Sequence, residues 1–281
     1  MTVGSSMGVD EDFRGVRSMI AAGRNSEAAG AISEIALSRR GDPLALLTCV
    51  SLLRTICADE EADSAARLLT SADWGASAPE VARGLRAMGY PAEALGVARS
   101  ADMGDGGRLE AAALRDMGRH AEAAEILSGM PDRATEDEID LAESLSLSGA
   151  SDEAIGIAES LLEGSPGDFR VQRMYCSALV SVGRKRDADR YVRLRLKEDS
   201  DSADSNALAA HLFWIMGRVT VAGAYAGKAV KADPGHLGGM EVLAYSMIKR
   251  GMTREAKIIA GAINEKSPGN PSAFRILNAC R

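Results

Sequence analysis

Aromatic residues, cysteine and histidine are all scarce in this chain. Only 4% of its 281 residues are aromatic, and it contains four cysteines and three histidines. The cysteines form no CxxC pair or other spacing typical of a metal site, so we expect them to be reduced and structural. No apolar run reaches the roughly 18 residues that a membrane-spanning helix needs. The first ten residues also lack the basic start and apolar core of a signal peptide. We therefore expect a cytoplasmic protein with no membrane partner.

Sequence motifs of common enzymes are absent as well. The chain has no HExxH, GxSxG or GxxxxGK[ST] motif, and its glycines are not arranged as a nucleotide-binding loop. The histidines His120, His211 and His236 are far apart in the sequence and have no neighbour that would make a base or a metal ligand. We expect no catalytic residue, no cofactor and no metal site, and hence a protein that is not an enzyme.

Glycine instead recurs at regular intervals. The spacings between successive turn positions are 34, 32, 29, 31, 34, 34 and 34 residues, which matches the 34-residue period of helix-turn-helix repeats. An alanine follows each turn position five residues later in all eight repeats. The turn positions are Gly23, Cys57, Gly89, Gly118, Gly149, Gly183, Gly217 and Gly251, and the alanines are Ala28, Ala62, Ala94, Ala123, Ala154, Ala188, Ala222 and Ala256.

Two further columns of residues precede each turn. A small residue stands seven positions before the turn, and a large apolar residue stands three positions after the small one in every repeat. Small side chains let two helices approach closely, and large ones fill the space between them. Each repeat is therefore predicted to be an antiparallel pair of helices. The large residues are Met19, Leu53, Leu85, Leu114, Leu145, Leu179, Phe213 and Met247.

These columns resemble the tetratricopeptide repeat (TPR) family, in which a small residue on the first helix, a glycine at the turn and an alanine on the second helix mark the packing contacts. The family's closing proline is also present, 17 residues after the glycine, at Pro166, Pro234 and Pro268. The family's tryptophan before the turn and its aromatic after the turn are missing. The resemblance implies an all-α fold, an α-solenoid wound as a right-handed superhelix.

The repeats define the predicted domain organisation. Residues 1–8 are expected to be a flexible N-terminus, residues 9–270 to form eight TPR-like repeats in one solenoid, and residues 271–281 to form a C-terminal capping helix. The glycine-rich segment 103–107 is predicted to be a turn, because glycines destabilise a helix interior.

A column of acidic residues marks the start of the second helices. A carboxylate stands four positions after the turn in seven repeats. It interacts favourably with the helix dipole there, so we interpret the column as structural and not as a metal site. The residues are Glu27, Glu61, Glu93, Glu122, Glu153, Asp187 and Glu255.

Another stripe of each first helix is the candidate binding surface. Residues ten, six and three positions before the turn share one helical face, and in TPR proteins this face lines the concave groove. Arginine fills seven of these 24 positions and only two are acidic, although the chain has a net charge of −7. Clustered arginines can bind carboxylates or phosphates. The arginines are Arg17, Arg54, Arg83, Arg86, Arg108, Arg115 and Arg173, and the acidic residues are Glu143 and Glu241.

Towards the C-terminal end the same stripe contains His211, Trp214 and Tyr245. Exposed aromatic residues are typical anchors of protein interfaces, although Trp214 would also fit between neighbouring helices. We predict that the groove binds an acidic or C-terminal peptide segment of a protein partner, which would make the chain an adaptor or scaffold for protein–protein interaction. The carboxylate clamp of TPR co-chaperones is a weaker match, because none of the 24 positions holds asparagine.

Two alternatives remain open at this point. Helical repeats can also bind RNA, but an isoelectric point near 5.2 and the lack of repeated aromatics on the groove argue against nucleic acid. A self-assembling structural subunit, for example a homodimer, is the third class.

Overall fold

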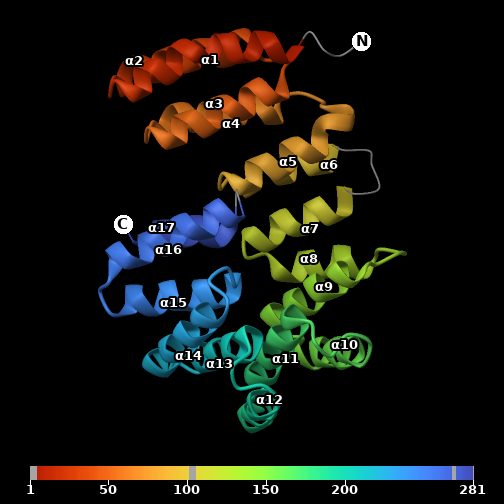
Figure 1. The fold of residues 1–281 in the computed structure, drawn as a ribbon. Coiled ribbons are helices and arrows are strands. Elements are labelled where there is room, and N and C mark those ends of the chain that lie inside the picture. The colour runs from red at the N-terminus through yellow and green to blue at the C-terminus, as the bar shows by residue number, and fades with distance from the viewer. Residues whose placement is uncertain (1–4, 101–105, 268–269, 281) are drawn as a thin grey trace. The chain divides into compact units, whose positions relative to one another are not determined.

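The computed structural model describes residues 5–100, 106–267 and 270–280, and nearly all of this part of the chain is helical (Figure 1). No strand occurs among these residues, so the prediction of an all-α fold is confirmed. The segment 101–105, which holds most of the predicted glycine-rich turn, lies outside the described residues. No helix in the described ranges is both long and apolar enough to cross a membrane.

The helices alternate as first and second members of pairs. Odd-numbered helices are first members, even-numbered helices are second members, and α17 stands alone at the end of the chain (Figure 1). The helices are α1 (Ser5–Ala21), α2 (Asn25–Ser38), α3 (Pro43–Thr55), α4 (Asp59–Thr70), α5 (Ala78–Ala87), α6 (Pro91–Ser100), α7 (Gly106–Asp116), α8 (His120–Ser128), α9 (Thr135–Ser148), α10 (Ser151–Gly164), α11 (Phe169–Ser181), α12 (Lys185–Glu198), α13 (Ala203–Ile215), α14 (Val219–Ala232), α15 (Leu237–Lys249), α16 (Thr253–Lys266) and α17 (Pro271–Ala279), with a short 3₁₀ turn η1 (Gly75–Ser77) before α5.

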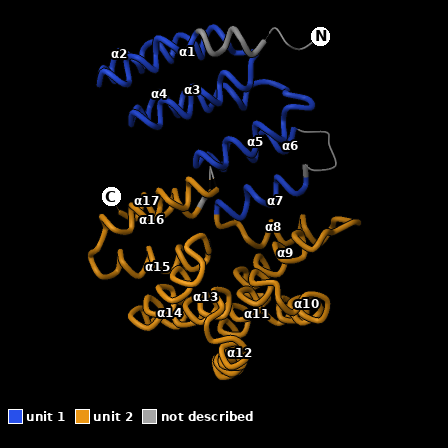
Figure 2. The backbone as a smooth tube through the Cα atoms, viewed as in Figure 1, with its two compact units in different colours: residues 1–117 blue, residues 118–281 orange. Residues whose placement is uncertain are grey.

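The chain divides into two compact units, residues 1–117 and 118–281 (Figure 2). The sequence analysis predicted one solenoid over 9–270, and the boundary falls within a predicted repeat, between α7 and α8. Unit 1 contains α1 to α7, and unit 2 contains α8 to α17. In a repeat stack each helix packs mainly on the helices next to it. A boundary between compact units can therefore fall at the turn within a repeat as well as between two repeats. Helix α1 begins at Ser5, four residues before the predicted first repeat.

The turn glycines adopt the conformation that only glycine accepts without strain. All seven have a positive φ, from 72° at Gly23 to 101° at Gly149. The residue after the turn donates a hydrogen bond back to the helix that has just ended, as Arg218 does to the carbonyl of Phe213 over 2.8 Å. This is the bond that closes a helix end in the Schellman motif. The predicted turns are therefore confirmed.

Cys57 occupies the one turn position without glycine, and its φ of 60° is the only positive φ of a non-glycine residue in the described ranges. A left-handed conformation costs an L-residue about 1–2 kcal/mol. We expect Cys57→Gly to raise the free energy of unfolding by about 1 kcal/mol, less than the full strain because glycine is more flexible in the unfolded chain. Urea denaturation of the full chain measures this change. Cys57→Ala keeps the Cβ atom and is the control; equal stabilisation by alanine would show that backbone strain is not the cause.

The alanine column is fully buried, whereas Met19, Leu145 and Met247 of the large apolar column are only partly buried. All eight alanines of the second-helix column are 0% exposed. Four of the large residues on the first helices, Leu53, Leu85, Leu114 and Leu179, are also 0% exposed. The acidic column lies in the first turn of α2, α4, α6, α8, α10, α12 and α16, as the sequence predicted. The core of each unit is thus the contact between alanine faces and large apolar residues of neighbouring helices.

A second column, which the sequence analysis missed, starts the first helices. The N-cap side chains of five first helices accept a hydrogen bond from a backbone N–H of the first turn, which would otherwise be unpaired. In His236 the ring Nδ1 accepts this bond from Gly239 over 2.9 Å, and Nε2 lies 2.8 Å from Asp204. The caps are Asp42, Asp168, Ser202, His236 and Asn270, and the last four are 34 residues apart.

The cysteines are all free thiols. Cys49 and Cys176 are 0% exposed, and burial raises the pKa of each thiol to about 12. A thiol with so high a pKa stays protonated near neutral pH and is a poor nucleophile. These two residues therefore act as small core side chains, as the sequence predicted.

Candidate interaction surface

In unit 2 the predicted binding stripe contains two groups of contacts, one around Arg173 and one between Trp214 and Tyr245. We call these residues together the inner surface of unit 2. It runs over the first helices α9, α11, α13 and α15, and its residues are Glu143, Arg173, Ser177, His211, Trp214, Glu241 and Tyr245. Each contact joins a residue on one first helix to a residue on another, so the surface is built from side chains that are distant in the sequence.

Arg173 on α11 contacts both acidic residues of the stripe. Its Nη2 atom lies 2.8 Å from Glu143 on α9, and its Nη1 atom lies 3.9 Å from Glu241 on α15, two repeats further along the chain. Glu241 also accepts a hydrogen bond from Ser272 over 2.9 Å and lies 3.8 Å from Arg275 on α17. The guanidinium of Arg173 is therefore already paired within unit 2.

His211 on α13 is a neutral member of the surface. Its Nε2 atom lies 2.8 Å from Ser177 Oγ, and this hydroxyl donates to the Arg173 carbonyl, so the imidazole N–H donates to Ser177. Burial, together with the positive charge of Arg173, lowers the pKa of His211 to about 3. The ring carries no charge near neutral pH and contributes a hydrogen bond in place of a positive charge.

Trp214 and Tyr245 form the apolar part of the surface. Their rings stack with centroids 5.8 Å apart and an interplanar angle of 26°. Both side chains are half-buried, and Trp214 packs against the core of unit 2. The sequence left open whether Trp214 binds a partner or packs between helices. The structure shows the packing, and it leaves part of the ring pair accessible to a partner side chain.

In unit 1 the arginines of the stripe differ in how they are paired. Arg54 lies 3.1 Å from Asp59, and its guanidinium carbon lies 5.9 Å from the centroid of the Tyr90 ring. Arg86 on α5 lies 2.7 Å from Asp116 on α7.

Arg83 on α5 is exposed and makes no hydrogen bond or ion pair with the part of unit 1 that the structure describes. The three remaining arginines of the stripe, Arg17, Arg108 and Arg115, each have an interaction partner.

The predicted site residues are thus divided between the two units. Unit 1 carries six of the seven arginines, whereas unit 2 carries Arg173, His211, Trp214 and Tyr245.

Within the described residues, no three His, Cys, Asp or Glu side chains are grouped so that they would hold a metal ion. The sequence analysis did not predict two of the ion pairs. Asp116, the partner of Arg86, is 30 residues away in the sequence, and Glu241, a partner of Arg173, is 68 residues away.

Comparisons with known proteins give matches among solved structures. No family model matches the sequence, and no curated protein matches it. The chain is similar to TTC0263, a TPR protein of Thermus thermophilus, with a TM-score of 0.44 and 15% identity over 63% of this chain and 98% of that one. A tetratricopeptide repeat protein of Parabacteroides merdae has a TM-score of 0.47 and 14% identity over 86% and 99% of the two chains. YrrB, described as a TPR protein with an unusual peptide-binding site, has a TM-score of 0.34 and 12% identity over 62% and 91%.

The fold itself rests on the features of this chain. The paired helices, the left-handed turn glycines and the fully buried alanine column are the features that the resemblance to TPR proteins implied. The described residues of each unit form an all-α array of paired helices.

Proposed function

We propose that the protein is a non-enzymatic interaction scaffold whose first-helix stripe binds an acidic or C-terminal peptide segment of a partner. The observation that carries this proposal is Arg83, an exposed arginine with no partner in the described part of unit 1, on a stripe that holds five more arginines. A guanidinium group binds a carboxylate through two parallel hydrogen bonds. Arg86, Arg108 and Arg115 would extend this contact along α5 and α7.

The internal ion pair of Arg86 does not prevent such binding. Its side chain and that of Asp116 are 23% and 25% exposed, so part of the pair remains open to solvent. An incoming carboxylate can therefore share the Arg86 guanidinium with Asp116, because this group has five N–H donors. In unit 2, the accessible parts of the Trp214 and Tyr245 rings would bury an apolar side chain of the same or another partner.

The test reverses the charge of Arg83 and Arg86 and keeps an ion pair between positions 86 and 116. We expect Arg83→Glu combined with Arg86→Glu and Asp116→Arg to weaken binding of acidic peptides by at least about tenfold. The exchanged pair at Arg86 and Asp116 keeps opposite charges in contact. Peptides selected from a random displayed library on the wild-type chain serve as probes, and fluorescence anisotropy measures their affinity.

Arg67→Glu on α4 is the matched control, because it changes the net charge by the same amount at another exposed arginine of unit 1. It should leave the affinity unchanged. Selection of peptides without acidic residues, or equal affinity in the triple variant, would contradict the proposal. Capture of RNA from a native lysate that nuclease abolishes would favour the RNA-binding alternative, and light scattering would detect self-assembly.

A further inference from the structure

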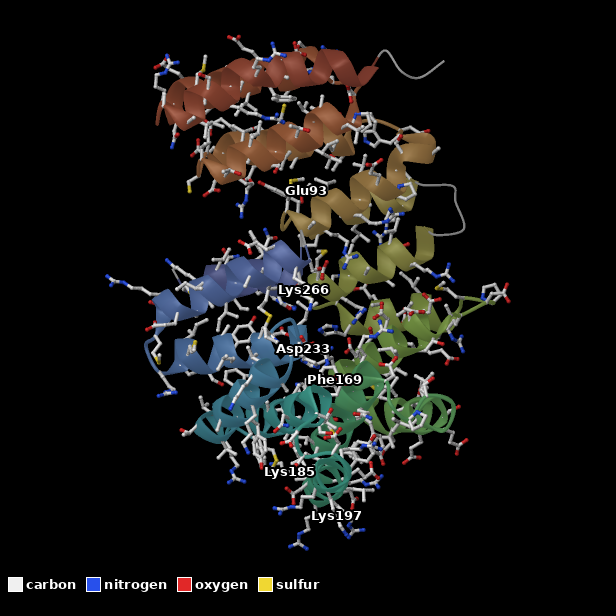
Figure 3. All side chains as sticks on the ribbon, in the orientation of Figure 1. Glu93, Phe169, Lys185, Lys197, Asp233 and Lys266 are labelled. Carbon is white, nitrogen blue, oxygen red and sulfur yellow. The ribbon has the colours of Figure 1, made fainter. Side chains whose placement is uncertain are left out.

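Positive charge is concentrated on two second helices of unit 2. Helices α12 and α14, taken with the arginine before each, contain ten basic residues and three acidic ones, although the whole chain has a net charge of −7. Figure 3 labels Lys185 and Lys197 on α12. The basic residues are Arg184, Lys185, Arg186, Arg190, Arg193, Arg195, Lys197, Arg218, Lys228 and Lys231.

Most of this charge is not neutralised within the unit. Three of the arginines pair with the three acidic residues of α12: Arg184 with Asp187, Arg193 with Asp189 and Arg195 with Glu198. The four lysines form no ion pair with any described residue, and all four are exposed. This surface therefore attracts negative charge.

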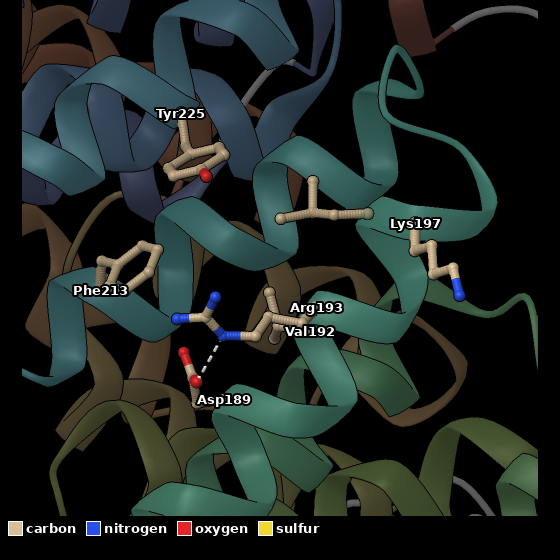
Figure 4. A pocket seen from close by; sticks show the side chains of 7 residues that line it. Asp189, Val192, Arg193, Lys197, Phe213 and Tyr225 are labelled. Atoms are coloured by element: carbon tan, nitrogen blue, oxygen red, sulfur yellow. Dashed lines mark hydrogen bonds and ion pairs between the residues drawn. The ribbon is translucent and has the colours of Figure 1, made fainter.

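A pocket of about 370 Å³ lies beside Lys197, between α12, α13 and α14 (Figure 4). We call it the outer pocket. Its apolar wall consists of Val192, Leu196, Phe213 and Tyr225, and Arg193 and Lys197 stand at its edge. Val192 and Phe213 belong to the buried core of unit 2, so the wall is fixed in place.

The two aromatic rings of the wall are stacked and flanked by cations. Phe213 and Tyr225 have centroids 5.5 Å apart and an interplanar angle of 23°. The Arg218 guanidinium lies 4.8 Å from the centroid of Phe213, and Lys228 Nζ lies 5.0 Å from that of Tyr225. Cation–π contacts of this kind hold both positive charges close to the apolar wall.

A second pocket extends the binding area along α14. It has a volume of about 510 Å³ and is lined by Lys228 and Lys231 on α14, by Ser200 and Asp201 in the loop before α13, and by Asn206 on α13. Lys228 also contacts Tyr225, which lines the outer pocket. Lys228 therefore lies between the apolar wall of the outer pocket and a region that holds Lys231 and the Asp201 carboxylate.

We propose that the outer pocket binds an acidic peptide segment that inserts one bulky apolar side chain against Phe213, Leu196 and Tyr225. Carboxylates on either side of that side chain contact Lys197 and Lys228. Apart from Phe213 on α13, the lining residues of the outer pocket lie on the second helices α12 and α14, whereas Arg83 of the proposed function lies on the first helix α5. The two proposals are therefore tested by different variants.

A peptide fits this surface better than a nucleic acid does. The Asp189 carboxylate lines the outer pocket beside Arg193, 2.6 Å from its Nε atom (Figure 4). A phosphate at this position would meet that negative charge, whereas an apolar side chain would contact the aliphatic and aromatic wall. Lys197 lines the outer pocket and Lys228 lies against its Tyr225 ring. These are single cations beside an apolar wall, whereas a phosphate backbone needs a continuous positive groove.

The test uses a fluorescein-labelled synthetic peptide with one central phenylalanine flanked by glutamates, and the full-length protein. A second peptide replaces the phenylalanine by serine at the same net charge. We expect Lys197→Glu combined with Lys228→Glu to weaken binding of the phenylalanine peptide by about tenfold or more, and the serine peptide to bind the wild type about tenfold more weakly. Fluorescence anisotropy gives each affinity.

Lys249→Glu combined with Arg250→Glu is the matched control, since both residues are exposed in unit 2 and the change in net charge is the same. This control and Arg83→Glu should leave the affinity unchanged. Three results would overturn the proposal: no binding by the wild type, equal binding of the serine peptide, or equal binding by the Lys197 and Lys228 variant. Tighter binding of a single-stranded oligonucleotide that the same variant weakens would identify nucleic acid as the occupant instead.

Discussion

Leu179→Ala is expected to lower the free energy of unfolding of unit 2 by about 2–5 kcal/mol. Leu179 is 0% exposed and belongs to a core cluster that joins α9 to α15. The substitution removes three carbon atoms from a close-packed position and leaves a cavity against the alanine faces of neighbouring helices. In a repeat stack each interface stabilises the repeats on both sides. We therefore expect faster amide hydrogen exchange on several helices next to α11.

Leu147→Ala on α9 is the control for this result. It makes the same chemical change, but the Leu147 side chain is 65% exposed, so the expected effect is within about 0.5 kcal/mol. Urea denaturation with hydrogen exchange measured by mass spectrometry reports both the free energy and the helices involved. A loss for Leu179→Ala no larger than that of the control would contradict the packing described for α11.

The second large effect is expected from His211 at acidic pH. The pKa of His211 is lowered to about 3 in the folded chain, whereas an unfolded histidine titrates near pH 6.5. The unfolded chain therefore binds a proton that the folded chain excludes, and stability falls as the pH drops below about 6.5. We expect a loss of about 2 kcal/mol between pH 6.5 and about 4.5, from one proton at up to about 1.4 kcal/mol for each pH unit.

His211→Gln isolates this contribution, because glutamine does not titrate and can still donate to Ser177. The two proteins differ only at this residue, so the difference between the two stability profiles reports His211. Urea midpoints measured at several pH values between 7 and 4.5 give this difference. Parallel profiles would show that His211 is protonated normally in the folded chain.

The helix pairs were predictable because their signals are local. Gly217 ends one helix and Ala222 packs on the next, so the sequence spacing itself reports the structure. The N-cap column at Asp168, Ser202 and His236 carries the same 34-residue period. It was missed because three different residue types perform the same function, so no single letter repeats.

The chemistry of the binding stripe was less predictable, because it depends on contacts between repeats. A count of charges identified Arg173 as one cation among seven, but the pairing of Arg173 with Glu241 follows from how closely α11 and α15 approach. The neutral state of His211 likewise depends on burial by other helices. Arg83 has no such contact in the described part of unit 1, and its exposure agrees with the sequence-based picture of a solvent-facing stripe.

In a stack of helix pairs, most contacts join neighbouring repeats. The contact between Arg173 on α11 and Glu241 on α15 spans two repeats, past the intervening helix α13. Widening of unit 2 along its inner surface would separate these two side chains. A ligand that enters between them would meet a cation, Arg173, on one side and a carboxylate, Glu241, on the other.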